Sequence, residues 1–271
     1  MNSHIVLCSG MLSLLFLASC IPATTVPIGS ISFQRSQAVQ HHTLVVFLPG
    51  RGSSVRSFGD EGLVQQLRRR RPDIDMVGVE AHWGYYRDRS VMVRLKEDII
   101  APAKRLGYDN IWLVGISMGG LGALLYDTAY PDDVTGICML APYLGEGDVL
   151  EEINRAGGLA KWQPGAARGN DTDREIWQKL TPYAAGSKSA DRVYLGFGTD
   201  DRFAATNRYF GKLLPDGQML TAAGGHDWPT WRTLWDRMLQ RSGFLESVPH
   251  REVRRPASPE PKGGSGLLPM P

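Results

Sequence analysis

Near the middle of this 271-residue sequence stands Ile111-Trp112-Leu113-Val114-Gly115-Ile116-Ser117-Met118-Gly119-Gly120. Large apolar residues lead into a Gly-x-Ser-x-Gly turn, and residues 121–126 continue in a pattern typical of a helix. A strand, a tight turn and a helix in this order strain the serine backbone and project its hydroxyl from the carboxyl edge of a sheet. Because Gly-x-Ser-x-Gly alone is common, the flanking pattern is what predicts a nucleophilic Ser117.

Short apolar runs and helix-length segments alternate on both sides of this turn. The runs are rich in Val, Ile and Leu and predict buried parallel strands over 44–48, 74–79, 111–114, 137–140, 193–197 and 219–221. The segments between them predict helices over 55–71, 90–106, 118–130 and 229–239. This alternation predicts an α/β fold: a mostly parallel sheet of about six or more strands with helices on both faces.

The first 20 residues differ from this body, since they contain no Lys, Arg, Asp or Glu. The apolar stretch 5–18 is short for a membrane span but suits the core of a signal peptide. It ends in Leu17-Ala18-Ser19-Cys20, which resembles the lipobox of bacterial lipoproteins. The resemblance implies a signal peptide over 1–19 and a lipid on Cys20; ordinary signal cleavage and a buried N-terminal helix are the alternatives.

The lipoprotein resemblance implies an enzyme anchored to a membrane of the bacterial cell envelope, at the outer membrane or the periplasmic face, with secretion or a free periplasmic protein as the alternative. Residues 20–40 are expected to form a linker, and 41–245 one catalytic domain in which 143–191 supply cap or substrate loops. The Pro- and Gly-rich segment 246–271 is expected to be a disordered tail.

The stretch GISMGGLGALLYDTAYPDDVTGICMLAPYLG, residues 115–145, resembles the elbow, helix and next strand of α/β-hydrolase esterases. The similarity is to the esterase D and feruloyl-esterase kind, and it extends over about 43–240. It implies an α/β-hydrolase fold and serine esterase chemistry. No cofactor is expected, because the sequence contains neither G-x-x-x-x-G-K-[ST] nor G-x-G-x-x-G. In this family the serine, the acid and the histidine follow one another in chain order, each after a strand.

Both partners of the serine are expected downstream. The predicted strand 193–197 runs into a loop in which the resemblance favours Asp201 as the acid, with Asp200 as the alternative. The stretch GGHDWPTW, residues 224–231, is similar to the histidine loop of these esterases and implies His226 as the base. His82, which follows an earlier strand, is the rival base or a residue lining the pocket.

Ester hydrolysis also needs donors for the oxyanion of the tetrahedral intermediate. The resemblance implies one backbone N–H from Met118 and a second from the loop after the first strand. The family often has His-Gly-x in that loop, whereas this chain has Pro49-Gly50-Arg51. We expect the Arg51 N–H to be the second donor, with Gly52 as the alternative, because a backbone group needs no particular side chain.

Composition narrows the possible partners and functions. The 30 Lys and Arg nearly balance the 28 Asp and Glu, so nucleic acid is not an expected partner. No metal-ligand spacing is present, so no metal is expected either. The expected function is hydrolysis of carboxylic esters with short or medium acyl groups, through an acyl-enzyme intermediate. A thioesterase or lysophospholipase acting on envelope lipids, and a non-catalytic binding lipoprotein with this fold, are the alternatives.

Overall fold

A computed structural model of the chain describes residues 22–33, 43–165, 172–186 and 188–245. The expected signal peptide over 1–19, the lipidation site Cys20 and the tail 246–271 lie outside the described residues. The expected catalytic domain is therefore described except for its margin at 41–42 and the segments 166–171 and 187.

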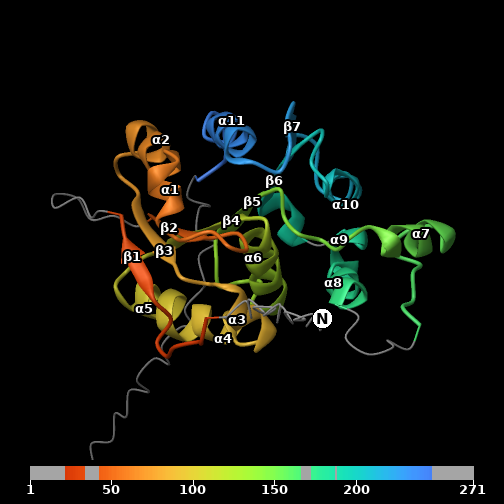
Figure 1. The fold of residues 1–271 in the computed structure, drawn as a ribbon, viewed down its shortest axis with the longest axis horizontal. Helices are drawn as coiled ribbons and strands as arrows, with labels where there is room; N and C mark the ends of the chain where they lie inside the picture. The colour runs from red at the N-terminus through yellow and green to blue at the C-terminus, as the bar shows by residue number, and fades with distance from the viewer. Residues whose placement is uncertain (1–21, 34–42, 166–171, 187, 246–271) are drawn as a thin grey trace, which may run out of the picture.

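Seven strands form one sheet in the order β1-β3-β2-β4-β5-β6-β7 (Figure 1). All neighbouring pairs are parallel except β1 and β3, which are antiparallel at one edge. The strands are β1 (Ser30–Ser32), β2 (Thr43–Leu48), β3 (Asp75–Val79), β4 (Asn110–Ile116), β5 (Gly136–Leu140), β6 (Val193–Gly198) and β7 (Met219–Ala222). The predicted α/β fold with a mostly parallel sheet is confirmed.

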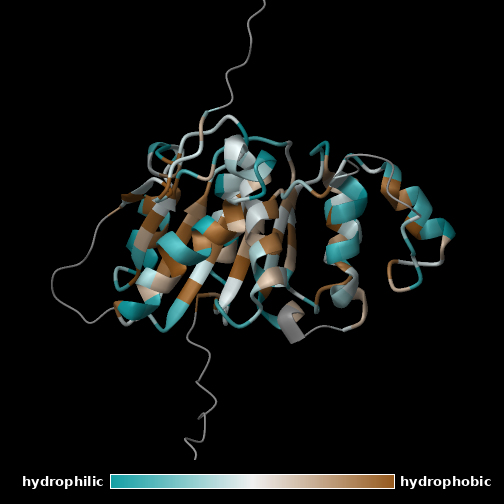
Figure 2. Cartoon of the chain, turned by 90° about the horizontal axis from the view of Figure 1, so that it is seen from below, coloured by the Kyte–Doolittle hydropathy of each residue, from teal (hydrophilic) through white to brown (hydrophobic). Residues whose placement is uncertain are grey.

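Helices cover the two faces of this sheet because its central strands are apolar along their whole length. Every residue of β2 and β4 is buried, and Figure 2 shows the hydrophobic residues concentrated in the strands. The helices α2 (Leu63–Arg70) and α11 (Trp228–Met238) lie on one face, while α5 (Ala101–Arg105) and α6 (Met118–Ala129) lie on the other (Figure 1).

Two of the predicted helices are interrupted. The segment 55–71 divides into α1 (Ser57–Asp60) and α2, because Gly62 takes a left-handed conformation with φ 86°. The segment 90–106 contains α4 (Val91–Arg94), the π-helix η1 (Leu95–Ile100) and α5. Pro102 has no N–H to donate to the Asp98 carbonyl four residues earlier, so a regular α-helix cannot pass through this point.

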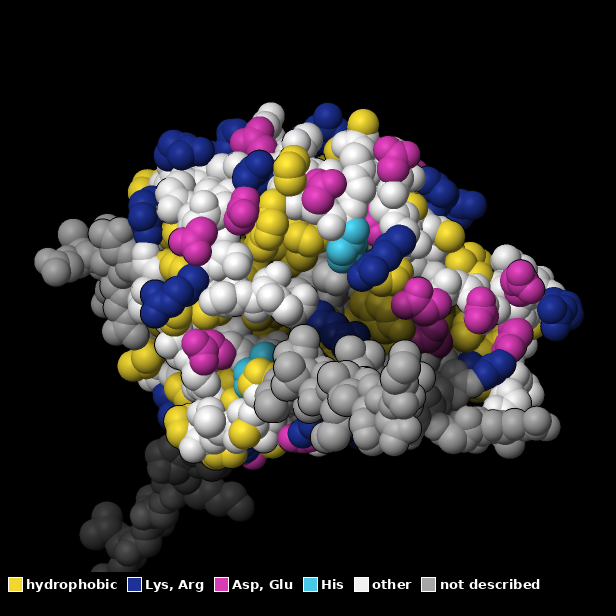
Figure 3. All heavy atoms as spheres, viewed as in Figure 1, with side chains coloured by type: hydrophobic (Ala, Val, Ile, Leu, Met, Phe, Trp, Pro, Cys, Tyr) yellow, Lys and Arg dark blue, Asp and Glu magenta, His cyan; other side chains and the backbone are white. Residues whose placement is uncertain are grey.

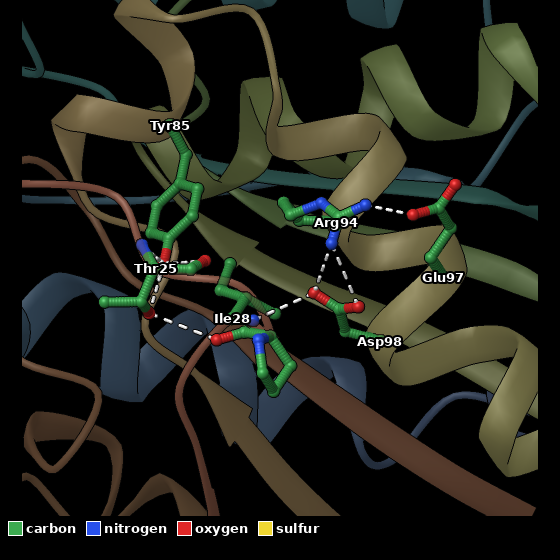
Figure 4. A network of polar contacts seen from close by, with 7 residues as sticks. Thr25, Ile28, Tyr85, Arg94, Glu97 and Asp98 are labelled. Carbon is green, nitrogen blue, oxygen red and sulfur yellow. Dashed lines mark hydrogen bonds and ion pairs between the residues drawn. The ribbon is translucent and has the colours of Figure 1, made fainter.

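The expected linker 20–40 needs a correction, because its described part packs on the domain. Residues 30–32 form β1 on the outer edge of β3. Figure 4 shows the preceding residues held by polar contacts: Thr25 N–H donates to the Tyr85 hydroxyl (3.0 Å), and Ile28 N–H donates to the Asp98 carboxylate (2.8 Å). Arg94 binds the same carboxylate. The described residues 22–33 therefore belong to the folded domain.

The segment expected to supply cap or substrate loops is largely helical where it is described. It contains α7 (Asp148–Arg155), α8 (Thr172–Lys179), α9 (Thr181–Ala184) and the 3₁₀ turn η2 (Lys188–Arg192). Two further helices, α3 (Trp83–Arg87) and α10 (Ala204–Gly211), follow β3 and β6. None of the helices in the described part of the chain has the length and apolar character needed to cross a bilayer.

Candidate active site

Ser117 occupies the sharp turn between β4 and α6. Its backbone has φ 52° and ψ −115°, a conformation that costs free energy for any residue other than glycine. Three backbone hydrogen bonds hold it there: Ser117 N–H donates to Leu140 O (2.9 Å), and Leu121 and Tyr143 N–H donate to Ser117 O (both 3.1 Å). The predicted strained turn is therefore present, fixed by its neighbours on both sides.

Two glycines make this turn sterically possible. A Cβ atom on Gly115 would lie 2.1 Å from the carbonyl oxygen of Gly119, and one on Gly119 would lie 2.0 Å from that of Leu48. Both neighbours are backbone atoms that cannot move aside cheaply. The Gly-x-Ser-x-Gly pattern thus has a packing cause: β2, β4 and α6 meet too closely at this point for any side chain.

The three side chains predicted as nucleophile, base and acid form a continuous hydrogen-bonded chain. His226 Nε2 lies 3.0 Å from Ser117 Oγ, and His226 Nδ1 lies 2.8 Å from Asp201 Oδ2. Ser117 follows β4, Asp201 follows β6, and His226 follows β7. Since parallel strands bring their carboxyl ends to one edge of a sheet, residues far apart in the sequence meet there.

Asp201, and not Asp200, faces the histidine. The Asp201 side chain is fully buried, and its second oxygen, Oδ1, accepts the Phe203 N–H (2.8 Å). Both carboxylate oxygens therefore have a donor, which keeps the side chain in one orientation. The Asp200 side chain is exposed. Its backbone N–H donates to Gly224 O (3.0 Å), and this bond joins the loop after β6, which carries Asp201, to the loop after β7, which carries His226.

Two aromatic rings hold the imidazole of His226 from the sides. Phe203 and Trp231 lie 5.2 Å and 5.0 Å from it, ring centre to ring centre, and both are nearly perpendicular to it. Neither residue was predicted from the sequence to belong to the site. Their spacing was a usable signal, because Phe203 comes two residues after the acid and Trp231 lies on the first turns of the helix that follows the histidine.

The two segments predicted to supply oxyanion donors both adjoin Ser117. Met118 is the first residue of α6, so its N–H has no acceptor within the helix. In the loop after β2, a Cβ on Gly50 would lie 3.4 Å from the Ser117 Cβ, and Arg51 comes next. The Arg51 guanidinium stacks over Trp83, 5.0 Å from the ring centre. The donor roles of Met118 and of Arg51 or Gly52 stay predictions.

His82, the rival base, has a structural contact of its own. It is the N-cap residue of α3, and its Nδ1 accepts the Gly84 N–H (3.2 Å). Its ring centre lies 4.6 Å from that of Tyr85. The imidazole that contacts Ser117 is that of His226.

Tyr143 packs beside Phe203, whose ring also lies beside His226 of the candidate site. Its ring centre lies 5.2 Å from that of Phe203, and its hydroxyl donates to Asp173 Oδ1 on α8 (3.0 Å). Burial, reinforced by the Asp173 charge, raises the pKa of the Tyr143 hydroxyl far above its usual value, so the phenol stays protonated. Figure 3 shows hydrophobic, charged and histidine side chains around a hollow on this face of the molecule.

The sequence matches the profile of the Esterase family over residues 98–241, more than half of the chain. No curated protein sequence matches it.

Solved structures match the fold at low sequence identity. A ferulic acid esterase superposes with a TM-score of 0.55 at 17% identity, covering 74% of this chain and 84% of that chain. S-formylglutathione hydrolase from Staphylococcus aureus gives a TM-score of 0.52 at 14% identity, covering 75% and 82%. The fluorophosphonate-binding serine hydrolase F of the same organism gives 0.51 at 12% identity, covering 82% and 100%. At these identities the matches show the fold.

Proposed function

Because this chain belongs to the Esterase family, we propose that it hydrolyses carboxylic esters with Ser117 as nucleophile, His226 as general base and Asp201 as the acid that orients the histidine. The observation that carries this proposal is the hydrogen-bonded chain from Asp201 through His226 to Ser117, with links of 2.8 Å and 3.0 Å. A serine hydroxyl is a weak nucleophile, and a base within hydrogen-bonding distance is what activates it.

In the first half of the reaction, Ser117 Oγ attacks the carbonyl carbon of the ester while His226 Nε2 takes the hydroxyl proton. The buried carboxylate of Asp201 stabilises the imidazolium through its Nδ1–H. The negative charge on the former carbonyl oxygen is stabilised by the Met118 N–H and by that of Arg51 or Gly52. The carbon–oxygen bond to the alcohol then breaks, and the alcohol leaves with the proton from His226.

In the second half, water replaces the alcohol. His226 takes a proton from water, the resulting hydroxide equivalent attacks the acyl-enzyme carbonyl, and a second tetrahedral intermediate forms. When it collapses, the bond from the carbonyl carbon to Ser117 Oγ breaks and the serine oxygen recovers the proton from His226. The products are a carboxylic acid, an alcohol and the enzyme in its initial protonation state.

The acyl group we propose is short or medium in length. The helices described between β5 and β6, α7 to α9, have eight residues or fewer and do not form a long apolar lid. Thioesters and lysophospholipids offer the same reactive carbonyl and are the alternative substrates. We also propose anchoring through a lipid on Cys20, which mass spectrometry of the mature N-terminus would test against a Cys20→Ala variant.

A fluorophosphonate probe tests the proposed nucleophile. It should label the wild-type protein at Ser117 and leave Ser117→Ala unlabelled, because the probe reacts with activated serines. Equal labelling of both proteins would refute the assignment. Rates on p-nitrophenyl esters of graded chain length, and on matched thioesters, would then rank the acyl group; a binding protein without catalysis would cleave none of them.

A further inference from the structure

Arg202 places a positive charge beside the candidate base. It directly follows Asp201, and its guanidinium carbon lies 4.6 Å from the centre of the Phe203 ring. That ring lies 5.2 Å from the centre of His226, so the two distances together leave at most about 10 Å between the cation and the imidazole. The Arg202 side chain is exposed at this point.

This charge is available to a ligand. Within residues 22–33, 43–165, 172–186 and 188–245, no carboxylate lies within 4.0 Å of the Arg202 guanidinium. Two of the acids near it have other partners: Asp201 accepts from His226 and the Phe203 N–H, and Asp173 accepts from the Tyr143 hydroxyl and the Glu146 N–H (2.8 Å). Asp200, two residues before Arg202, is exposed and forms no ion pair with it among the described residues. The Glu146 carboxylate, whose charge also contributes to the raised pKa of Tyr143, is exposed to solvent.

The order of the strands places Arg202 and Arg51 on opposite sides of Ser117. Arg202 follows β6 and Arg51 follows β2, and these strands lie on opposite sides of β4, which carries Ser117. His226 delivers its proton to the leaving alcohol, so the leaving oxygen must lie against His226 Nε2. Phe203 packs beside His226 and carries Arg202 on its ring, so a leaving group that extends from Nε2 past Phe203 would meet the Arg202 guanidinium.

We propose that the substrate is an ester whose leaving alcohol carries a carboxylate, and that the Arg202 guanidinium binds this carboxylate. The inference rests on the esterase function proposed above. A guanidinium presents parallel N–H donors that match both oxygens of a carboxylate, and an aromatic ring beneath it limits the orientations that it samples. The product alcohol of such a reaction is a hydroxy acid.

The test compares two esters of nearly equal size: 3-acetoxybenzoate, whose leaving group carries a negative charge, and 3-acetoxybenzamide, whose leaving group is neutral. For the wild-type enzyme we expect kcat/KM to favour the carboxylate by about tenfold, equivalent to about 1.4 kcal/mol. Arg202→Gln should bring this ratio close to one, and Arg202→Glu should bring it below one. The ratio should also fall as salt is added, because salt screens exposed charges.

The matched control is Arg208→Gln. Arg208 is also an exposed arginine over a phenylalanine ring, 5.8 Å from the centre of Phe197, but it lies on α10 instead of the acid loop. This variant should keep the wild-type ratio. In a second pair the charge lies on the acyl side: phenyl hydrogen succinate carries a carboxylate there, and phenyl butyrate is neutral. The ratio of kcat/KM for this pair should be the same in Arg202→Gln as in the wild type.

The two proposals fail in different ways. A wild-type preference for the neutral amide, or a carboxylate preference that survives in Arg202→Gln, would overturn the inference about Arg202 while the esterase function stands. If neither ester is cleaved and the fluorophosphonate does not label Ser117, the esterase function itself is wrong and the inference falls with it.

Discussion

Two aspartates of this protein, Asp201 and Asp127, are buried with each carboxylate oxygen against a partner. Asp201 contacts the His226 imidazole and the Phe203 N–H at the carboxyl edge of the sheet. Asp127 accepts the Tyr183 hydroxyl (2.9 Å) and forms an ion pair with Arg192 (2.8 Å). It lies on α6 ten residues after Ser117, which is about 15 Å along a helix.

Both aspartates are buried, and the two sites differ in the residues that contact the carboxylate. An imidazole changes its protonation state near neutral pH, so a carboxylate beside it can stabilise a proton in transit. A guanidinium stays charged, and burial together with the Asp127 charge raises the pKa of the Tyr183 hydroxyl far above its usual value. The contacts of Asp127 therefore hold α6 to α9, whereas those of Asp201 serve proton transfer in the proposed mechanism.

The largest expected effect comes from Asp201→Asn. The amide can still fit the same space, but it cannot stabilise an imidazolium, and it favours the wrong tautomer of His226. We expect kcat on a p-nitrophenyl ester to fall by about 10³–10⁴, with little change in the denaturant midpoint. Asp200→Asn is the matched control, and a larger loss in that variant would reverse the assignment of the acid.

Tyr183→Phe tests the other aspartate. The variant leaves Asp127 Oδ2 buried without the donor that it has in the wild type, and we expect the free energy of unfolding to fall by about 2 kcal/mol. Urea titration measures this loss, and esterase activity well below the transition should remain. A loss of turnover comparable to that of Asp201→Asn, at unchanged stability, would mean that both aspartates serve the chemistry.

These two sites also differ in how far sequence patterns predict them. The strand–turn–helix pattern and the order of the strand ends led to Ser117 and His226, because parallel strands expose their carboxyl ends at one edge. The choice between Asp200 and Asp201 depended on a resemblance, since both aspartates occupy the same turn and only its backbone geometry directs one of them inward. The contact between Asp127 and Tyr183 joins positions 56 apart and has no local signature.

The fold shows the same division. The central strands were predictable within a residue or two because they are apolar and buried along their length. The edge strand β1 was not, because Ser30–Ser32 offers one apolar residue and depends on its pairing with β3. Helix interruptions at Gly62 and before Pro102 reflect single residues whose effect depends on the surrounding packing.

Trp231→Leu tests how the histidine is positioned. Removing the ring that lies 5.0 Å from His226 frees one side of the imidazole, and we expect kcat to fall about tenfold with KM nearly unchanged. Trp231→Phe keeps a perpendicular ring and should restore most of the rate. If both variants lose the same activity, or if KM changes instead of kcat, Trp231 lines the substrate site and does not position His226.

The smallest expected effect is on how the free energy of unfolding changes as the pH falls below neutral. Asp127 and Asp133, which lies six residues later in the chain, should change it in opposite directions. Burial would raise the pKa of Asp133, but Lys104 (2.9 Å), Lys96 (3.1 Å) and the Tyr126 hydroxyl (3.0 Å) together lower it. For Asp127, burial raises the pKa and Arg192 and Tyr183 offset only part of the rise.

The signs follow from linkage between proton binding and folding. Asp133 has a lowered folded-state pKa, so its stabilisation is present above its unfolded pKa and is lost as pH falls through the folded value. Asp127 has a raised folded-state pKa, so the folded state gains stability relative to the unfolded state as pH falls through that value. In urea titrations from pH 7 to pH 3, Asp133→Asn should therefore lose less stability than the wild type, and Asp127→Asn should lose more. Parallel curves for the two variants would show that the buried ion pair with Arg192 outweighs burial at Asp127.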